Sequence, residues 1–179
     1  MSGIWKQVKA WASLIGIYFK PVHAESWNEI QRTIRNRFPD VRRISAGELA
    51  AWIEDSGRVA PVLIDARMEE EFDVSHLPNA RNARTVKTVR ALVSSDTQPI
   101  VVYCSMGYRS SSLARKLQKA GFTNVANLEG SLFGWANEGR LLHRGTESAN
   151  PTKVHPYNGK WGKLLKSELR EEGRVMSDE

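Results

Sequence analysis

Two short apolar segments constrain the fold of this chain more than any other feature. They are residues 61–65 (PVLID) and 99–103 (PIVVY), and stretches with helical character separate the apolar segments along the chain. A strand that is apolar along its length is buried on both faces, which is typical of a parallel sheet covered by helices. The sequence therefore predicts an α/β fold, in which a parallel sheet carries helices on both faces.

The same alternation continues on both sides of these segments. Ser45 and Glu48 form a capping-box pattern, which predicts that a helix begins there. Two further strands are expected at residues 80–83 and 124–128. The expected helices are residues 26–37, 47–54, 68–72, 85–94 and 110–120, with a last helical turn at 134–138.

Composition narrows the class of protein. A single cysteine, Cys104, excludes an internal disulfide and a cluster of zinc thiolates. The hydrophobic fraction of 41% and the charged fraction of 26% are those of a soluble globular protein. The net charge of +6 favours anionic ligands. No motif that reads DNA or RNA is present, so we predict no nucleic-acid partner, and we expect neither a metal nor a cofactor.

The chain is predicted to have three parts: an N-terminal helical extension (1–43), one domain (44–145) and a C-terminal extension (146–179). Apolar residues recur at helical spacing near the N-terminus, namely Ile4, Val8, Trp11, Ile15 and Tyr18. We expect a short amphipathic helix there, which docks on the protein or makes peripheral contact with a membrane. A signal peptide over residues 1–24 is the alternative. Without one, we expect a cytoplasmic protein.

Cys104 directly follows the apolar strand at residues 99–103. Ligands of open parallel sheets bind beyond the carboxyl ends of the strands. The loop after Cys104 leads into a helix, whose free N–H groups and dipole favour an anion. Gly107 permits a left-handed turn and Arg109 adds a positive charge. We therefore predict an acidic, nucleophilic thiol. The alternative is a buried cysteine that only fills space, with Arg109 at the surface.

Several segments, taken in order, resemble the single-domain rhodanese-like sulfurtransferase family. The upstream segments are residues 63–67 (LIDAR), 70–72 (EEF) and 76–80 (HLPNA). The loop at 104–110 (CSMGYRS) resembles the active-site loop of the family, and Leu128-Glu129-Gly130 with Trp135 resembles its closing motif. Ser131 stands where the family has a second glycine, and we expect this departure to lie away from the nucleophile.

The resemblance implies a three-layer fold with about five parallel strands and a ping-pong sulfur transfer. The Cys104 thiolate would take sulfur from a small anionic donor such as thiosulfate. The resulting persulfide would pass it to cyanide or a thiol, and a sulfur-relay protein is a further expected partner. Glu71 and His76 are expected to hold the connection to the next strand. The residues expected to bind substrate are Ser105, Met106, Gly107, Tyr108, Arg109, Ser110, Asp65 and Arg67.

Other functions stay open beside this one. The loop also resembles that of phosphatases on this fold, which have the pattern Cys-x5-Arg. In this chain only four residues separate Cys104 from Arg109. The smaller loop suits a single sulfur atom, so a phosphatase or an arsenate reductase ranks below sulfur transfer. A persulfide carrier or a protein-interaction module with little turnover is the other alternative. The presence of Cys104, Gly107 and Arg109 together argues against a module that only binds.

Overall fold

The computed structural model describes residues 27–149 and 153–172. The chain divides into two compact units, Met1–Ile30 and Gln31–Glu179. Of the first unit only residues 27–30 are described, and they begin helix α2 (Trp27–Arg37). The amphipathic helix expected near the N-terminus, with its membrane and signal-peptide alternatives, lies outside the described residues. Among the helices that are described, none is long and apolar enough to cross a bilayer.

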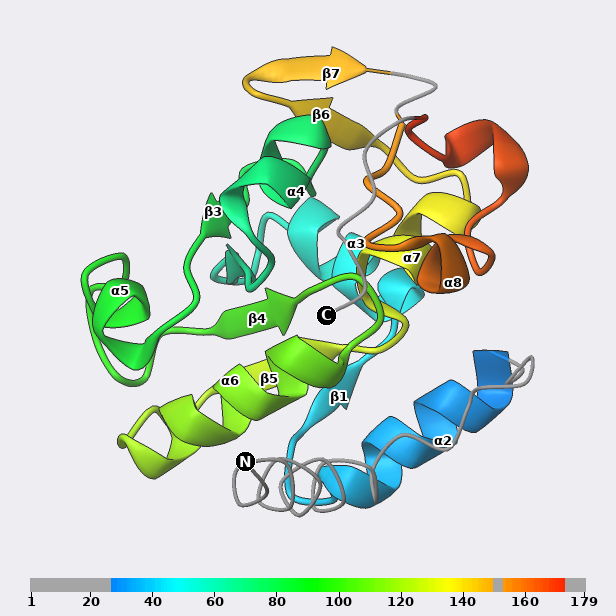
Figure 1. Ribbon diagram of the computed structural model, residues 1–179. Coiled ribbons are helices and arrows are strands. Elements are labelled where there is room, and N and C mark those ends of the chain that lie inside the picture. The colour runs from blue at the N-terminus through cyan, green and yellow to red at the C-terminus, as the bar shows by residue number, and fades with distance from the viewer. Residues whose placement is uncertain (1–26, 150–152, 173–179) are drawn as a thin grey trace, which may run out of the picture. The chain divides into compact units, whose positions relative to one another are not determined.

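A five-stranded parallel sheet forms the centre of the second unit (Figure 1). In spatial order its strands are β1 (Arg43–Ile44), β5 (Val125–Leu128), β4 (Ile100–Tyr103), β2 (Val62–Asp65) and β3 (Arg81–Asn82). Every residue of β4 and β5 is buried. The parallel sheet predicted from the apolar segments is therefore confirmed, with the most apolar segment at its middle.

Helices connect consecutive strands of this sheet and cover both of its faces. They are α3 (Ala46–Glu54), α4 (Glu69–Val74), α5 (Val86–Arg90) and α6 (Tyr108–Lys119), and α7 (Ser131–Asn137) follows β5. The chain crosses the sheet in one direction through α3 and α4, and in the other through α5 and α6. Because such crossovers are right-handed, the two pairs lie on opposite faces. Helix α7 lies beside α3, and α5 beside α6.

Local sequence explains where several of these helices begin and end. The capping box predicted for α3 is confirmed: the Ser45 hydroxyl accepts from the Glu48 N–H at 3.2 Å, and the Glu48 carboxylate accepts from the Ser45 N–H at 2.8 Å. Helix α5 ends at Arg90, earlier than predicted, and the Ser94 N–H instead donates to the Gln98 side chain at 2.7 Å. Helix α7 begins at Ser131, before the predicted turn.

The sequence did not predict β1 or a hairpin after α7. Strand β1 has two residues and is too short to show a hydrophobic period. The hairpin pairs β6 (Leu142–Arg144) with β7 (Glu147–Ala149). Reciprocal backbone hydrogen bonds of 2.9 Å between His76 and His143 join it to the domain. Beyond it lie α8 (Gly159–Gly162) and the 3-10 helix η1 (Ser167–Leu169).

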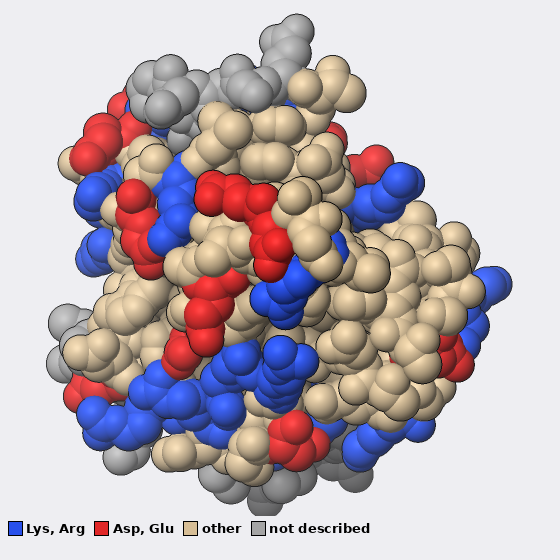
Figure 2. All heavy atoms as spheres, turned by 180° about the vertical axis from the view of Figure 1, so that it is seen from behind, with Lys and Arg blue, Asp and Glu red and all other residues tan. Residues whose placement is uncertain are grey.

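Charged side chains are unevenly distributed over the surface. Figure 2 shows one face, on which Lys and Arg side chains of the described residues gather into a band and acidic side chains border it. This face therefore presents adjacent charges of both signs rather than a uniformly positive field.

A buried ion pair holds the carboxyl end of β2. The side chains of Asp65 and Arg67 are both fully buried, and the guanidinium donates to the carboxylate at 2.7 Å through Nη2 and at 3.0 Å through Nε. Arg67 also donates to the carbonyl of Ser75, beyond α4. The Asn82 side chain, on β3, donates to the carbonyl oxygens of both Asp65 and Arg67. The pair therefore ties β2 to β3 and to the end of α4.

We predict that Arg67→Ala lowers the free energy of unfolding by about 3–5 kcal/mol, because it leaves the Asp65 carboxylate buried without its partner. Arg35→Ala is the matched control. Arg35 pairs with Glu129 at the surface, where such pairs contribute roughly 0–1 kcal/mol. Urea titration followed by circular dichroism measures both losses. Equal losses in the two variants would contradict a structural role for the buried pair.

Candidate active site

Cys104 lies in the loop between β4 and α6, at the carboxyl edge of the sheet. The residue is 2% exposed. The backbone N–H groups of Leu132 and Phe133, in α7, donate to the carbonyl oxygens of Cys104 and Ser105 at 3.0 and 3.1 Å. The start of the loop is therefore attached to α7, while its end continues directly into α6.

Two hydrogen-bond donors point at the thiol sulfur. The Gly107 N–H lies 3.1 Å from Sγ, and the Ser110 hydroxyl lies 3.4 Å from it. Gly107 has a φ of +112°, a left-handed conformation that lets the backbone turn back toward the sulfur. The sulfur is buried, but it faces polar donors rather than aliphatic side chains alone. Of the backbone N–H groups that the loop sequence predicts to converge on one point, that of Gly107 reaches the sulfur, and a serine hydroxyl supplies the second donor.

The surroundings lower the pKa of the Cys104 thiol below its usual value. Burial by itself would raise this pKa. The positive charge of Arg109 and the hydrogen bonds from Ser110 and Gly107 stabilise the thiolate and outweigh the effect of burial. A thiol that ionises readily is a better nucleophile near neutral pH, because more of it is thiolate.

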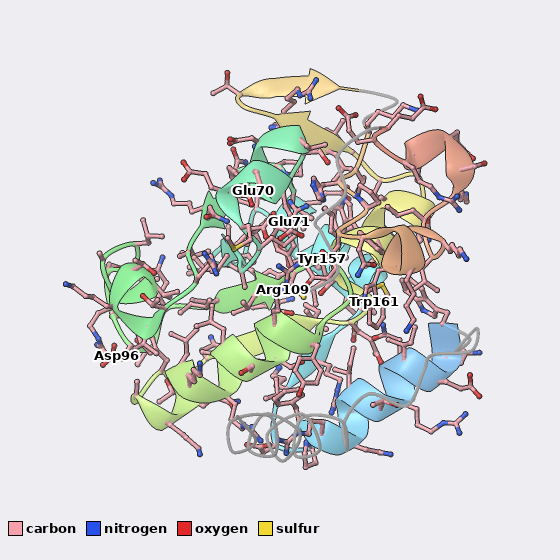
Figure 3. The ribbon with its side chains drawn as sticks, in the orientation of Figure 1. Glu70, Glu71, Asp96, Arg109, Tyr157 and Trp161 are labelled. Atoms are coloured by element: carbon pink, nitrogen blue, oxygen red, sulfur yellow. The ribbon has the colours of Figure 1, made fainter. Side chains whose placement is uncertain are left out.

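Arg109 is held in place by a buried carboxylate. Its Nη1 and Nη2 atoms donate to the two oxygens of Glu71 at 2.7 and 2.8 Å. Nη2 also donates to the Ser105 hydroxyl at 2.9 Å, and that hydroxyl donates to Glu71 at 3.1 Å. Figure 3 shows Glu71 and Arg109 meeting between α4 and α6. Three side chains thus form a closed network that couples α4 to the Cys104 loop.

Glu71 belongs to this network, and the sequence did not reveal that role. Burial alone would raise the pKa of its carboxyl. The hydrogen bond and charge of Arg109, the Met68 N–H and the charge of Arg67 outweigh burial and lower the pKa. We expected Glu71 only to hold the connection to the next strand. That interpretation was incomplete, because the partners lie 38 residues apart and no local pattern joins them.

Ser131 contacts the backbone of Cys104. Its hydroxyl accepts from the Cys104 N–H at 3.2 Å and donates to the Leu128 carbonyl at 3.1 Å. The expectation that this departure from the family pattern lies away from the nucleophile was wrong. Ser131 is fully buried and has a φ of +51°, which strains any residue except glycine. The backbone keeps the conformation of a glycine position, while the serine hydroxyl adds a contact to Cys104.

Gln31 braces the loop from α2. Its Nε2 donates to the Met106 carbonyl at 3.1 Å, and its Oε1 accepts from the Gly130 N–H at 3.2 Å. Gln31 therefore joins the active-site loop to the turn before α7. No sequence signal pointed to it, because a lone glutamine on a helix is ordinarily exposed to solvent.

The other predicted site residues lie in different environments. Tyr108 is half exposed, and its ring packs edge-on against Phe38 at 5.1 Å, while the Met106 side chain is buried. Asp65 and Arg67 form a hydrogen-bonded ion pair with each other. The charge of Arg67 also helps to lower the pKa of Glu71. Their predicted place at the border of a substrate pocket stays a prediction.

His76 lies apart from these residues. It stacks on Phe72 with ring centroids 4.0 Å apart, and its Nδ1 lies 2.9 Å from the Leu77 carbonyl oxygen. These contacts agree with a structural role for His76. Within the described part of the chain, no group of three or more His, Cys, Asp or Glu side chains is arranged to hold a metal ion.

A sequence model of the rhodanese-like domain matches residues 45–138, which are 94 of the 179 residues. The chain therefore belongs to the rhodanese-like domain family. The resemblance drawn from the motifs is confirmed.

Relatives with curated names cover parts of the chain. It is 34% identical over 89 residues to adenylyltransferase and sulfurtransferase UBA4 of Scheffersomyces stipitis. This alignment covers 44% of this chain and 20% of that protein. It is 30% identical over 90 residues to thiosulfate sulfurtransferase GlpE of Coxiella burnetii. This alignment covers 50% of this chain and 79% of that protein. The chain spans about a fifth to a quarter of the length of the adenylyltransferase/sulfurtransferases that it matches.

Solved structures share the fold. The BH2092 protein of Bacillus halodurans matches with a TM-score of 0.55 and 23% identity, over 78% of this chain and 99% of that chain. Thiosulfate sulfurtransferase of Pseudomonas aeruginosa matches with a TM-score of 0.56 and 21% identity, over 75% of this chain and 25% of that chain. At these identities the likeness concerns the fold alone, and it confirms the predicted α/β architecture.

We predict that Ser110→Ala shifts the pH midpoint of Cys104 alkylation upward, because it removes a donor from the thiolate. With iodoacetamide as reagent, alkylation below the midpoint should slow by about three- to tenfold. Ser111→Ala is the control, since Ser111 is also buried on α6 and its change leaves both hydrogen bonds to Sγ in place. Identical midpoints in the wild type and both variants would show that the Ser110 hydroxyl does not stabilise the thiolate.

We also predict an unusual order of stability at position 131. Ser131→Ala should lower the free energy of unfolding by about 1–3 kcal/mol, because the buried Cys104 N–H loses its acceptor and the backbone strain remains. Ser131→Gly loses the same hydroxyl but relieves the strain, so it should recover about 1 kcal/mol of that loss. Chemical denaturation measures both variants. A glycine variant less stable than the alanine variant would show that the left-handed backbone carries no strain.

Proposed function

We propose that the chain is a sulfurtransferase in which Cys104 carries a sulfane sulfur as a persulfide. The observation that carries the proposal is the thiol geometry: Sγ receives the Gly107 N–H and the Ser110 hydroxyl, and the charge of Arg109 favours the thiolate. Membership of the rhodanese-like family and the sulfurtransferase names of its relatives support the same class of reaction.

In the first half-reaction the Cys104 thiolate attacks the outer sulfur of a donor such as thiosulfate. A new S–S bond forms while the donor's S–S bond breaks, and sulfite leaves with the bonding electron pair. The product is a Cys104 persulfide with an anionic terminal sulfur. Backbone N–H groups of residues 105–110 would hold this sulfur, as an oxyanion hole holds oxygen.

In the second half-reaction an acceptor attacks the terminal sulfur. The S–S bond of the persulfide breaks, and Cys104 departs as a thiolate, ready for another donor. Cyanide would yield thiocyanate, and a thiolate acceptor would yield its own persulfide. The lowered pKa of Cys104 serves this step too, because a more acidic thiol is a better leaving group in exchange at sulfur.

Phosphoryl transfer fits the same residues less well. An arginine that binds phosphate does so through parallel N–H bonds. In this chain Nη1 and Nη2 of Arg109 both donate to Glu71. The four residues between Cys104 and Arg109 also make a loop one residue shorter than the Cys-x5-Arg loop of phosphatases. Sulfur transfer, which places one sulfur atom in the cradle, makes better use of this geometry.

A persulfide carrier that delivers sulfur to a relay protein is the second candidate. Tyr108 favours it, because this half-exposed ring beside the loop is available to a protein partner. Relatives named as adenylyltransferase and sulfurtransferase together support a relay. The chemistry at Cys104 is the same in both candidates, and the acceptor differs.

We predict that thiosulfate adds one sulfur atom, about 32 Da, to the wild type and nothing to Cys104→Ala. Intact-mass spectrometry measures the gain, and cyanide should remove it with release of thiocyanate. Many turnovers on cyanide would favour the enzyme, and a single discharge would favour the carrier. No mass gain with thiosulfate or with a small-molecule persulfide would contradict the proposed function. Phosphate release from an aryl phosphate, lost in Cys104→Ser, would favour the phosphatase.

A further inference from the structure

A segment beyond the matched domain is attached beside the active site. In residues 153–172, Val154 and Leu165 are buried. The Val154 N–H donates to the Leu169 carbonyl at 2.7 Å, which closes the segment on itself. Asn137, at the end of α7, donates to the Leu164 carbonyl at 2.8 Å and accepts from the Lys166 N–H at 3.0 Å. The segment is therefore anchored to the helix that holds the start of the Cys104 loop.

Tyr157, in this segment, covers the face of the Arg109 guanidinium. The guanidinium carbon lies 4.9 Å from the centre of the tyrosine ring. The edge of the guanidinium is occupied at the same time, because it donates to Glu71 and Ser105. Figure 3 shows Tyr157 close to Arg109, with Glu71 beside them. Arg109 is thus held at its edge by polar groups and on its face by an aromatic ring.

The backbone at Tyr157 is in a conformation that tyrosine rarely adopts. Its φ is +65°, and its N–H donates to Nδ1 of the buried His155 at 3.0 Å. A Cβ on Gly162 would lie 2.7 Å from the Cβ of Pro156, so the glycine allows α8 to pack closely against the turn. Strain of this kind persists where the surroundings impose it, and it is often found at functional sites.

We propose that Tyr157 is a positioning residue of the active site, whose ring holds the Arg109 guanidinium in the orientation that joins Glu71 to Ser105 of the Cys104 loop. The C-terminal segment would then complete the site that residues 45–138 supply in part. This inference rests on the proposed role of Cys104 as the nucleophile.

The physical basis is the behaviour of a partly exposed arginine. The Arg109 side chain is 33% exposed, and its hydrogen bonds to Glu71 and Ser105 hold only its edge, so without the ring water would screen its charge at the open face. An aromatic face attracts the cation and excludes water from one side. Charges interact more strongly where water is excluded, so the ring increases the effect of Arg109 on the Cys104 thiolate.

The test compares Tyr157→Phe with Tyr157→Leu in the full chain. Phenylalanine keeps the aromatic face, whereas leucine keeps apolar bulk and the strained backbone but removes the ring. The readout is the rate of Cys104 alkylation by iodoacetamide as a function of pH. We expect Tyr157→Phe to stay within about twofold of the wild type at every pH. We expect Tyr157→Leu to react about three- to tenfold more slowly below the midpoint and to have a higher midpoint.

The outcomes separate this inference from the proposed function. A wild-type midpoint at the value of an ordinary thiol would contradict the nucleophilic role of Cys104 itself. A low wild-type midpoint that Tyr157→Leu leaves unchanged would overturn the role of Tyr157 alone. Should Tyr157→Leu fail to fold by circular dichroism, Gly162→Ala takes its place, because it displaces the Pro156–Tyr157 turn and keeps the ring. We expect the same upward shift, and a wild-type midpoint in that variant would overturn the inference.

Discussion

The ion pair between Glu71 and Arg109 is the contact on which the arrangement of this active site depends. Glu71 is fully buried on α4, and Arg109 lies in the first turn of α6, the helix that follows the Cys104 loop on the other face of the sheet. A buried carboxylate is stable only with a partner, because the desolvation of an isolated charge is costly. Here the partner comes from the active-site loop itself. The same interaction therefore stabilises the packing of α4 and sets the orientation of the loop, so the fold and the site cannot vary independently.

This pairing also determines how the thiolate is stabilised. Glu71 compensates the charge of Arg109, so the pair as a whole is neutral. The contacts to Sγ come from uncharged donors, the Gly107 N–H and the Ser110 hydroxyl, and Arg109 acts through its field. In the proposed reaction a persulfide intermediate has to form and then be consumed. Binding that stabilised the intermediate as strongly as the transition state would not speed its transfer. A cradle of neutral donors suits an anion of this kind better than a direct ion pair does.

The parts that sequence could predict are those whose signal is local. Consecutive residues carry the signal for the buried strands β2 and β4, for the capping box at Ser45 and for the loop from Cys104 to Ser110. The contacts of Glu71, Gln31 and Ser131 with the loop join residues that lie 27 to 75 positions apart, and periodicity or spacing cannot reveal such pairs. The two-residue strand β1 escaped for the opposite reason, since it is too short to carry a period. Ser131 is instructive, because its place in the closing motif was visible but its contact with Cys104 depends on how α7 packs.

The active-site loop is braced from outside the segment that defines the family. Gln31 holds the Met106 carbonyl from before residue 45, and Tyr157 covers Arg109 from after residue 138. Residues 45–138 supply the proposed nucleophile, Cys104, and the hydrogen-bond donors to its sulfur. The two flanking contacts act on the Met106 carbonyl and the Arg109 guanidinium. In our proposal, the contact to Arg109 affects how readily the Cys104 thiol ionises. Two chains that share the matched segment but differ in these flanks would therefore share the proposed reaction class and differ in what holds the loop in place.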